Sequence, residues 1–157
     1  GVYERRLSEG ALGIVCHDDA GLCGMVWLGL GGAHPERDKF CTFLTPRDSA
    51  FTYDVSVPTR MQGRGIGTQL FRECVRYAQE HGRRRVLGYA SWGNRPSLRA
   101  CGRAGYRRVR TITVLSLLGI RIHRLHDPEW GRGARTWIGI RRSARVPVAP
   151  DRPSGHS

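Results

Sequence analysis

A glycine-rich segment between a strand-like and a helix-like stretch constrains the fold of this chain most strongly. Residues 62–67 read QGRGIG, with glycines at alternate positions. Residues 51–57 are rich in aromatic and β-branched side chains, which favour a strand, and Pro58 cannot donate a hydrogen bond to a sheet. From Ile66 onward apolar residues recur at helical spacing, and Gly82 is a typical helix end. The sequence therefore predicts a strand, a tight loop and an amphipathic helix.

A loop of this kind suits an anionic ligand. Without Cβ atoms, backbone N–H groups can approach an anion closely, and the first helical turn adds free donors and the positive end of the helix dipole. Arg64, with Arg60 nearby, places positive charge beside the loop. The residues alone thus predict a phosphate or pyrophosphate site, with an ordinary turn as the alternative.

Length and charge narrow the function classes. The chain has 157 residues, enough for one domain with a hydrophobic core, and a formal net charge of +13. This charge favours an anionic partner such as a phosphate-bearing coenzyme or nucleic acid, although an inert arginine-rich surface would give the same count. No RNA- or DNA-binding motif is recognisable. No apolar run reaches the ~20 residues that span a bilayer and no signal peptide is recognisable, so we expect no membrane partner.

The cysteines and histidines do not predict a metal site. The five cysteines have no CxxC pair and are odd in number, which predicts neither a disulfide framework nor a zinc site and favours a reducing cytoplasm. His123 and His126 are three residues apart on a predicted strand, where they point to opposite faces. We therefore expect no metal.

The remaining pattern predicts one α+β domain over residues 1–140 and a disordered basic tail over 141–157. A helix is expected to end at Gly10. The other expected elements are a hairpin of residues 11–16 and 22–30, a polar loop at 31–39, an extended piece at 40–44, a strand at 86–90, a helix from Asn94 to about Arg103, and strands at 106–116, 120–125 and 137–140.

A second motif follows the first. Asn94 is a typical helix N-cap with Pro96 in the first turn, and Gly105-Tyr106 follow eleven and twelve residues later. Together with Val55-Ser56-Val57 and the Q-x-x-G-x-G pattern of residues 62–67, this pair of motifs resembles the GNAT superfamily of acyl-CoA-dependent N-acetyltransferases. The resemblance spans roughly residues 11–125.

The resemblance implies a mixed, mostly antiparallel twisted sheet with flanking helices, in which a β-bulge splays the fourth and fifth strands apart. The family usually carries a strand and two helices before the hairpin, and they form much of the acceptor pocket. Only about ten residues precede the hairpin here, so the N-terminal part is expected to be shortened. Either the chain is a fragment, or a second copy or a partner chain completes the acceptor site.

The resemblance also implies acetyl-CoA as co-substrate. Backbone groups of Val55 and Val57 would pair with the pantetheine arm, the amides after Gln62 would hold the pyrophosphate, and Asn94 and Ser97 would contact the cofactor. The alternative role for Asn94 is that of a helix cap alone. The full expected set is Val55, Val57, Gln62, Gly63, Arg64, Gly65, Ile66, Gly67, Thr68, Asn94 and Ser97.

The chemistry implied is direct attack of an amine on a thioester. An alkylamine has a pKa near ~10.4 and is mostly protonated at neutral pH, so a general base is needed. Asp54 is the candidate, with a solvent-facing charge or a salt bridge to an arginine as the alternative. Tyr53 and Tyr89 are candidates for the acceptor site. Cys101 stands where many family members carry a tyrosine acid, and a packed helix residue is its alternative.

The leading functional prediction is an N-acetyltransferase that acts on a primary amine of a small molecule or peptide. One alternative is an acetyltransferase for an RNA-linked amine such as aminoacyl-tRNA, which the net charge would permit. Another is a non-catalytic acyl-CoA-binding regulatory module, which the cysteine at position 101 and the short N-terminal part favour.

Overall fold

The structure, a computed structural model, describes residues 1–36, 41–117, 120–126, 135–140 and 144–147. The chain divides into two compact units, one formed by residues 1–32 and 47–107 and the other by residues 33–46 and 108–157. The first unit contains the predicted strand, loop and helix.

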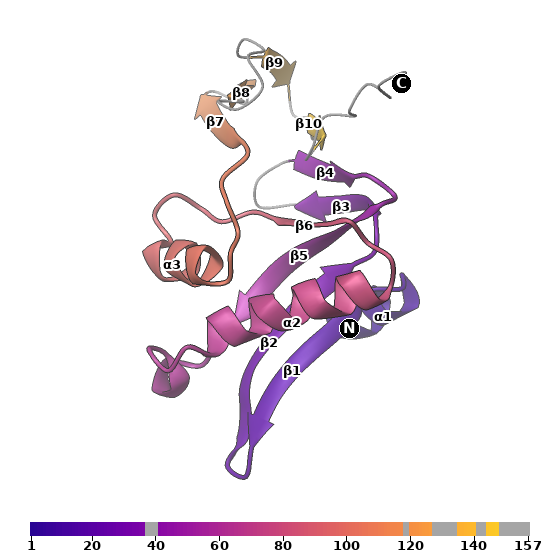
Figure 1. Ribbon diagram of the computed structural model, residues 1–157. Helices are drawn as coiled ribbons and strands as arrows, with labels where there is room; N and C mark the ends of the chain where they lie inside the picture. Colours follow the sequence, from indigo (N-terminus) through magenta and orange to yellow (C-terminus); the bar gives the residue numbers. More distant parts are fainter. Residues whose placement is uncertain (37–40, 118–119, 127–134, 141–143, 148–157) are drawn as a thin grey trace. The chain divides into compact units, whose positions relative to one another are not determined.

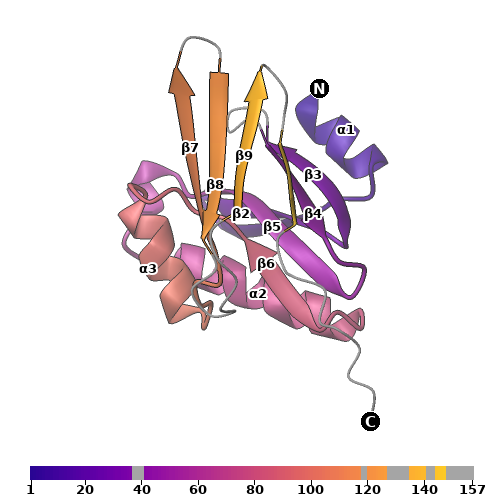
Figure 2. The same ribbon diagram turned by 90° about the horizontal axis from the view of Figure 1, so that it is seen from above.

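The first unit is a four-stranded sheet with helices on both faces. Its strand order is β1-β2-β5-β6, with β1–β2 and β2–β5 antiparallel and β5–β6 parallel. Figures 1 and 2 show α2 across one face of this sheet and α1 on the other. The elements are α1 (Val2–Ser8), β1 (Leu12–Asp18), β2 (Gly21–Gly29), β5 (Ser49–Ser56), a 3₁₀ turn (Thr59–Met61), α2 (Ile66–Glu80), β6 (Arg85–Gly88) and α3 (Arg95–Arg103).

The core of this unit lies between the sheet and α2. Because successive strand residues point to opposite faces, Val26, Leu28 and Ala50 pack beneath α2, whereas Trp27 and Tyr53 belong to the face that carries α1. The apolar stripe predicted for residues 66–80 is the buried face of α2, formed by Ile66, Leu70, Phe71, Cys74 and Ala78. The strand, loop and helix predicted around the glycines are therefore confirmed.

The second unit consists of two small sheets. One has the order β10-β4-β3 and the other β7-β8-β9. His123 is buried and His126 is exposed, as alternation along β8 requires. The strands are β3 (Gly32–Glu36), β4 (Cys41–Thr45), β7 (Thr111–Leu117), β8 (Ile120–His126), β9 (Arg135–Ile140) and β10 (Ala144–Pro147).

Three local predictions are wrong. Residues 32–36 form β3 instead of a polar loop; Pro35 is compatible with a strand there because β3 is the edge of its sheet. Residues 106–110 are not strand, and β7 begins at Thr111. Within the expected tail, residues 144–147 form β10 and pair with β4. The rest of the tail, 141–143 and 148–157, lies outside the described residues.

Asp48 joins the starts of β5 and β6. Its carboxylate accepts hydrogen bonds from the Arg85 guanidinium at 2.9 Å and from the Ser49 hydroxyl at 2.9 Å. The backbone N–H of Arg84 donates to the Asp48 carbonyl at 2.7 Å. The Arg85 and Ser49 hydrogen bonds hold the pKa of Asp48 below its ordinary value of 3.8.

This pKa shift predicts a pH-dependent contribution to stability. A carboxyl whose pKa is lower in the folded than in the unfolded state stabilises the fold above the unfolded pKa, and this contribution disappears as the pH falls through the folded pKa. Asp48→Asn is therefore expected to lower the free energy of unfolding at neutral pH, and the difference from the parent chain should shrink below about pH 4. Urea unfolding at a series of pH values measures this difference. If the free energies of unfolding of the parent chain and Asp48→Asn differ by the same amount at every pH, ionised Asp48 does not stabilise the fold in the way that we infer.

Candidate active site

The glycine loop presents the start of α2 to solvent. Gly63 and Gly65 have φ angles of 80° and 81°, in the left-handed region that favours glycine. Gly65 is the N-cap of α2; no side chain caps the helix, and its first turn contains no acidic residue. A Cβ at either glycine would meet nothing within 4 Å. Helix geometry leaves the first-turn amides of α2 without intrahelical acceptors, so they are donors that a ligand could use.

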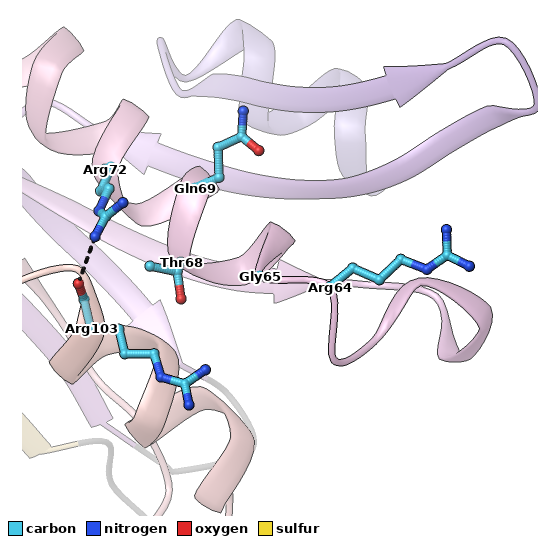
Figure 3. Close-up of a pocket in the computed structure, with 6 residues that line it drawn as sticks. All are labelled: Arg64, Gly65, Thr68, Gln69, Arg72 and Arg103. Carbon is cyan, nitrogen blue, oxygen red and sulfur yellow. Dashed lines mark hydrogen bonds between the residues drawn. The ribbon is translucent and has the colours of Figure 1, made fainter.

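An arginine-rich pocket of about 490 Å³ adjoins this helix end. It is lined by Arg64, Gly65, Thr68, Gln69, Arg72 and Arg103. In Figure 3 the Arg72 guanidinium on α2 points toward the backbone carbonyl of Arg103 on α3, and the Arg103 side chain extends away from Arg72. Thr68 lies between α2 and α3, whereas the side chain of Arg64 extends away along the loop. Arg72 donates a hydrogen bond to the backbone carbonyl of Arg103 at 3.1 Å.

The charge of this pocket is uncompensated by protein carboxylates. Within the described part of the chain, the guanidinium groups of Arg64, Arg72 and Arg103 form no ion pair with Asp or Glu. Their positive charges add to the positive end of the α2 dipole. The pocket can therefore bind a multiply charged anion with bidentate, charge-assisted hydrogen bonds.

Some predicted cofactor residues hold the loop in place by their side chains. The Gln62 amide donates to the Val57 carbonyl at 3.1 Å, which fastens the loop to the end of β5. Ile66 is 8% exposed and belongs to the core, so only its backbone is available to a ligand. Arg60 donates to the Leu22 carbonyl at 3.3 Å and is thus directed toward the β1–β2 hairpin.

The second motif positions α3 against α2. The Asn94 side chain accepts a hydrogen bond from the Ser97 N–H at 3.2 Å, so its predicted role as a helix cap is confirmed. A Cβ at Gly67 would lie 3.5 Å from the Cβ of Ala100, which shows how closely the two helices pack. The expected contacts of Asn94 and Ser97 with a cofactor stay predictions.

The register of β5 changes in its second half. Trp27 of β2 pairs with Tyr53 of β5, and Met25 pairs with Ser56. Between these two pairs β2 has one residue, Val26, and β5 has two, Asp54 and Val55. Two residues opposite one is the arrangement of a β-bulge. The pairing of β5 with β6 runs from Ser49↔Arg85 to Thr52↔Gly88, and β5 continues to Ser56. A pantetheine site along this end of β5, with Val55 and Val57, stays a prediction.

Asp54 has an unusual backbone conformation and an arginine partner. It is the only non-glycine residue with positive φ in the described chain, at 47°. Its carboxylate forms an ion pair with Arg6 of α1, as the alternative interpretation of this residue anticipated. The Arg6 guanidinium also lies 5.1 Å from the ring centre of Tyr53. Tyr89, the other predicted acceptor residue, is half-buried directly after β6.

Two proton donors lie near α3. Burial raises the pKa of the Cys101 thiol, an effect that a hydrogen bond from Ser97 partly offsets. Burial also raises the pKa of Tyr106, whose ring packs against Phe71 at 5.4 Å between centres. Both groups keep their protons at neutral pH, so each can donate a hydrogen bond to an anion and neither is a base. From the sequence, Tyr106 was recognised only as part of the Gly105-Tyr106 motif and not as a candidate proton donor.

Three arginines of the site, Arg72, Arg103 and Arg6, were not predicted from the sequence. Arg72 follows Thr68 by four residues, so helical spacing alone could have placed it on the same face. Arg103 and Arg6 carry no comparable signal, because packing between separate elements brings them to the site. In the parts of the chain that the structure describes, no helix is long and apolar enough to cross a membrane, and no three metal-ligating side chains gather.

Comparison with known proteins identifies the family. Residues 3–106 match the model of the acetyltransferase (GNAT) family. A search of curated protein sequences finds no significant match. Similar solved structures include the aminoglycoside N-acetyltransferase AAC(6')-Iy in complex with CoA (TM-score 0.55, 14% identity, covering 73% of this chain and 87% of that one). An acetyltransferase of Trypanosoma brucei has a TM-score of 0.52 at 21% identity, covering 74% and 75% of the two chains.

The ribosomal-protein-alanine N-acetyltransferase from Brucella melitensis has a TM-score of 0.51 at 18% identity, covering 87% of this chain and 72% of that one. At these identities the structures show a shared fold. The family match, by contrast, extends from α1 through the glycine loop to Tyr106. The chain therefore belongs to the GNAT family of acetyltransferases.

Proposed function

We propose that this protein transfers an acetyl group from acetyl-CoA to a primary amine of a small molecule or peptide. The observation that carries the proposal is the pocket at the start of α2, which is lined by three arginines that form no ion pair with a carboxylate of the described residues and which adjoins the uncapped end of the helix. CoA carries a pyrophosphate and a further phosphate that match this chemistry. The similar structures support it, since one contains CoA and another a CoA-based bisubstrate analogue.

The pocket offers two kinds of phosphate contact. The amides from Gly65 to Thr68 suit the pyrophosphate, because they converge at the positive end of the helix dipole. Arg72 and Arg103 stand on facing helices and suit a terminal phosphate, which their planar guanidinium groups can bind in a bidentate manner. The part of β5 beyond Thr52, no longer paired with β6, supports pantetheine binding by Val55 and Val57.

Acetyl-CoA supplies a thioester carbonyl that a neutral amine can attack. In the proposed mechanism the Asp54 carboxylate takes the proton of the incoming ammonium group, for which the Arg6 guanidinium must first withdraw. Tyr53 and Tyr89 line the acceptor side. Cys101 keeps a proton at neutral pH and can donate it to the departing thiolate, and Tyr106 beside it can donate a hydrogen bond.

Two other functions remain in competition. The net charge of +13 favours an acceptor amine carried on RNA, and such binding would weaken steeply with salt. The cysteine at position 101 and the Asp54–Arg6 pair favour a regulatory module that binds acyl-CoA without turnover. We place the protein in a reducing cytoplasm, which the odd number of cysteines and the lack of a CxxC pair support. A second copy or a partner chain that completes the acceptor side is also part of the proposal.

Removal of one pocket arginine tests the proposal. Arg103→Ala is expected to weaken acetyl-CoA binding by about tenfold or more, since a hydrogen bond to a charged group contributes about 1.5–3 kcal/mol. The change leaves intact the Arg103 carbonyl that Arg72 binds. The measurement is isothermal titration calorimetry with acetyl-CoA at fixed ionic strength.

Arg76→Ala is the matched control, because Arg76 lies on the same helix as Arg72 but is ion-paired with Glu73 and Glu80. It should bind acetyl-CoA like the parent chain. Equal affinities of the Arg103→Ala and Arg76→Ala variants would contradict the phosphate assignment.

A further inference from the structure

The Arg6 guanidinium lies over two aromatic rings on the face of the sheet opposite α2. The guanidinium carbon of Arg6 lies 5.2 Å from the ring centre of Trp27 and 5.1 Å from that of Tyr53. The same guanidinium is ion-paired with Asp54. Tyr3, one helical turn before Arg6, stacks on Trp27 at 5.7 Å. We call Trp27, Tyr53 and Asp54 the cation cluster.

The backbone of β5 is bent to build this cluster. In a regular strand, Tyr53 and Asp54 would point to opposite faces, and Asp54 would enter the apolar layer beneath α2. The extra residue in β5 and the positive φ of Asp54 bring both side chains to the same guanidinium, while Val55 packs against the core. A left-handed conformation is unfavourable for a residue with a Cβ, and such strain is typical of functional sites.

The cluster has the chemistry of a binding site for a cation. Two ring faces and a carboxylate attract a positive charge by cation–π and ion-pair interactions, and the site is partly desolvated because Trp27 is buried. The Asp54 side chain is nevertheless 48% exposed, so a ligand can reach its carboxylate from solvent. The present occupant is the chain's own Arg6, whose side chain is 19% exposed.

The helix that supplies Arg6 is weakly held. α1 has seven residues and none of them is buried. Its apolar side chains Val2, Tyr3 and Leu7 are 52%, 59% and 59% exposed. Elements with so few buried contacts open at low free-energy cost. Withdrawal of Arg6 therefore requires little more than the loss of its own contacts and those of Tyr3.

From these observations we infer that the cation cluster is the subsite for a positively charged acceptor, and that Arg6 occupies it as an internal competitor. The inference rests on the proposed function. A protonated amine takes the place of the Arg6 guanidinium between Trp27 and Tyr53. Its proton then passes to the Asp54 carboxylate, which leaves a neutral amine ready for attack. A neutral acceptor of the same shape gains nothing from the cluster.

The test uses a cation that cannot be acetylated, in the absence of acetyl-CoA. Choline and its neutral isostere 3,3-dimethylbutan-1-ol are titrated into the full chain and monitored by NMR at the Trp27 indole N–H. Arg6→Ala is expected to bind choline at least about tenfold more tightly than the parent chain, with no gain for the isostere. The double variant Arg6→Ala/Asp54→Asn should lose this gain.

Arg5→Ala is the matched control, since Arg5 is the neighbouring arginine of α1 and pairs with Glu9. It should bind choline like the parent chain. Because Arg6→Ala could unfold α1, the side-chain Nε–H signal of Arg6 is also followed in the parent chain. Saturating choline should shift this signal to that of a solvent-exposed arginine.

The proposal is overturned if choline binds while the Arg6 signal is unchanged, or if Arg6→Ala gains affinity equally for choline and its isostere. Failure of choline to bind any variant also overturns it. These outcomes are independent of acetyl transfer. An active enzyme with no choline site would reject the subsite alone, and a choline site in a protein that releases no CoA would reject the proposed reaction alone.

Discussion

Asp54→Asn is expected to lower the turnover number by about 100-fold or more, because general-base catalysis contributes about 10²–10⁴ to rate. Asparagine is among the residues that tolerate the left-handed region best, so the backbone at φ 47° is retained. The change removes the proton acceptor and the ion pair with Arg6, and it keeps the backbone conformation of the strand. The acid limb of the pH–rate profile should disappear with it.

The control for this variant is Asp48→Asn, which removes another arginine-paired carboxylate, from the residue directly before the start of β5. It is expected to lose stability but to keep its turnover number. Acetyl-CoA affinity, measured by calorimetry, should be unchanged in both variants. A normal rate and pH profile for Asp54→Asn would show that the base lies elsewhere.

Gly65→Ala is expected to weaken acetyl-CoA binding by at least about tenfold, which corresponds to about 1.4 kcal/mol. A Cβ here would project into open space at the N-cap of α2, next to the amides that are proposed to bind the pyrophosphate. The substitution also strains the backbone, since Gly65 has a φ of 81°. Strain of this kind costs about 1–2 kcal/mol of stability.

Gly82→Ala separates these two effects. Gly82 follows the other end of α2, has a φ of 69° and has open space around its Cβ position. The two variants should therefore lose similar stability in thermal unfolding, whereas only Gly65→Ala should lose affinity. If Gly65→Ala and Gly82→Ala bind acetyl-CoA with equal affinity in calorimetry, the pyrophosphate does not bind at this loop.

The parts of the fold that were predictable are those set by local chemistry. The helix of residues 66–80 could be predicted because its apolar stripe and glycine ends are local signals, and Asn94 because helix capping is decided within one turn. β3 and β10 were missed because each exists only by pairing with β4, which is distant from β10 in sequence. Pro35 also argued against a strand unless its edge position was known.

The same distinction applies to the candidate site. The anion-binding character of the loop follows from its glycines and from Arg64, all within six residues. The partners of the site do not follow in this way. Arg103 reaches the pocket through the packing of α3 on α2, and Arg6 of α1 pairs with Asp54 where the register between β2 and β5 shifts. The sequence could offer Asp54 both as a base and as half of a salt bridge, but not decide between them.

The most direct test of the proposed function is the release of free CoA thiol from acetyl-CoA, followed by a thiol-reactive dye with and without added amines. We expect thiol release that depends on both the protein and the amine. The amines tested are cationic small molecules and peptides, with aminoacyl-tRNA in a separate experiment. Tight binding of acetyl-CoA with no thiol release above background for any amine would contradict the proposed function and leave the regulatory module as the better description.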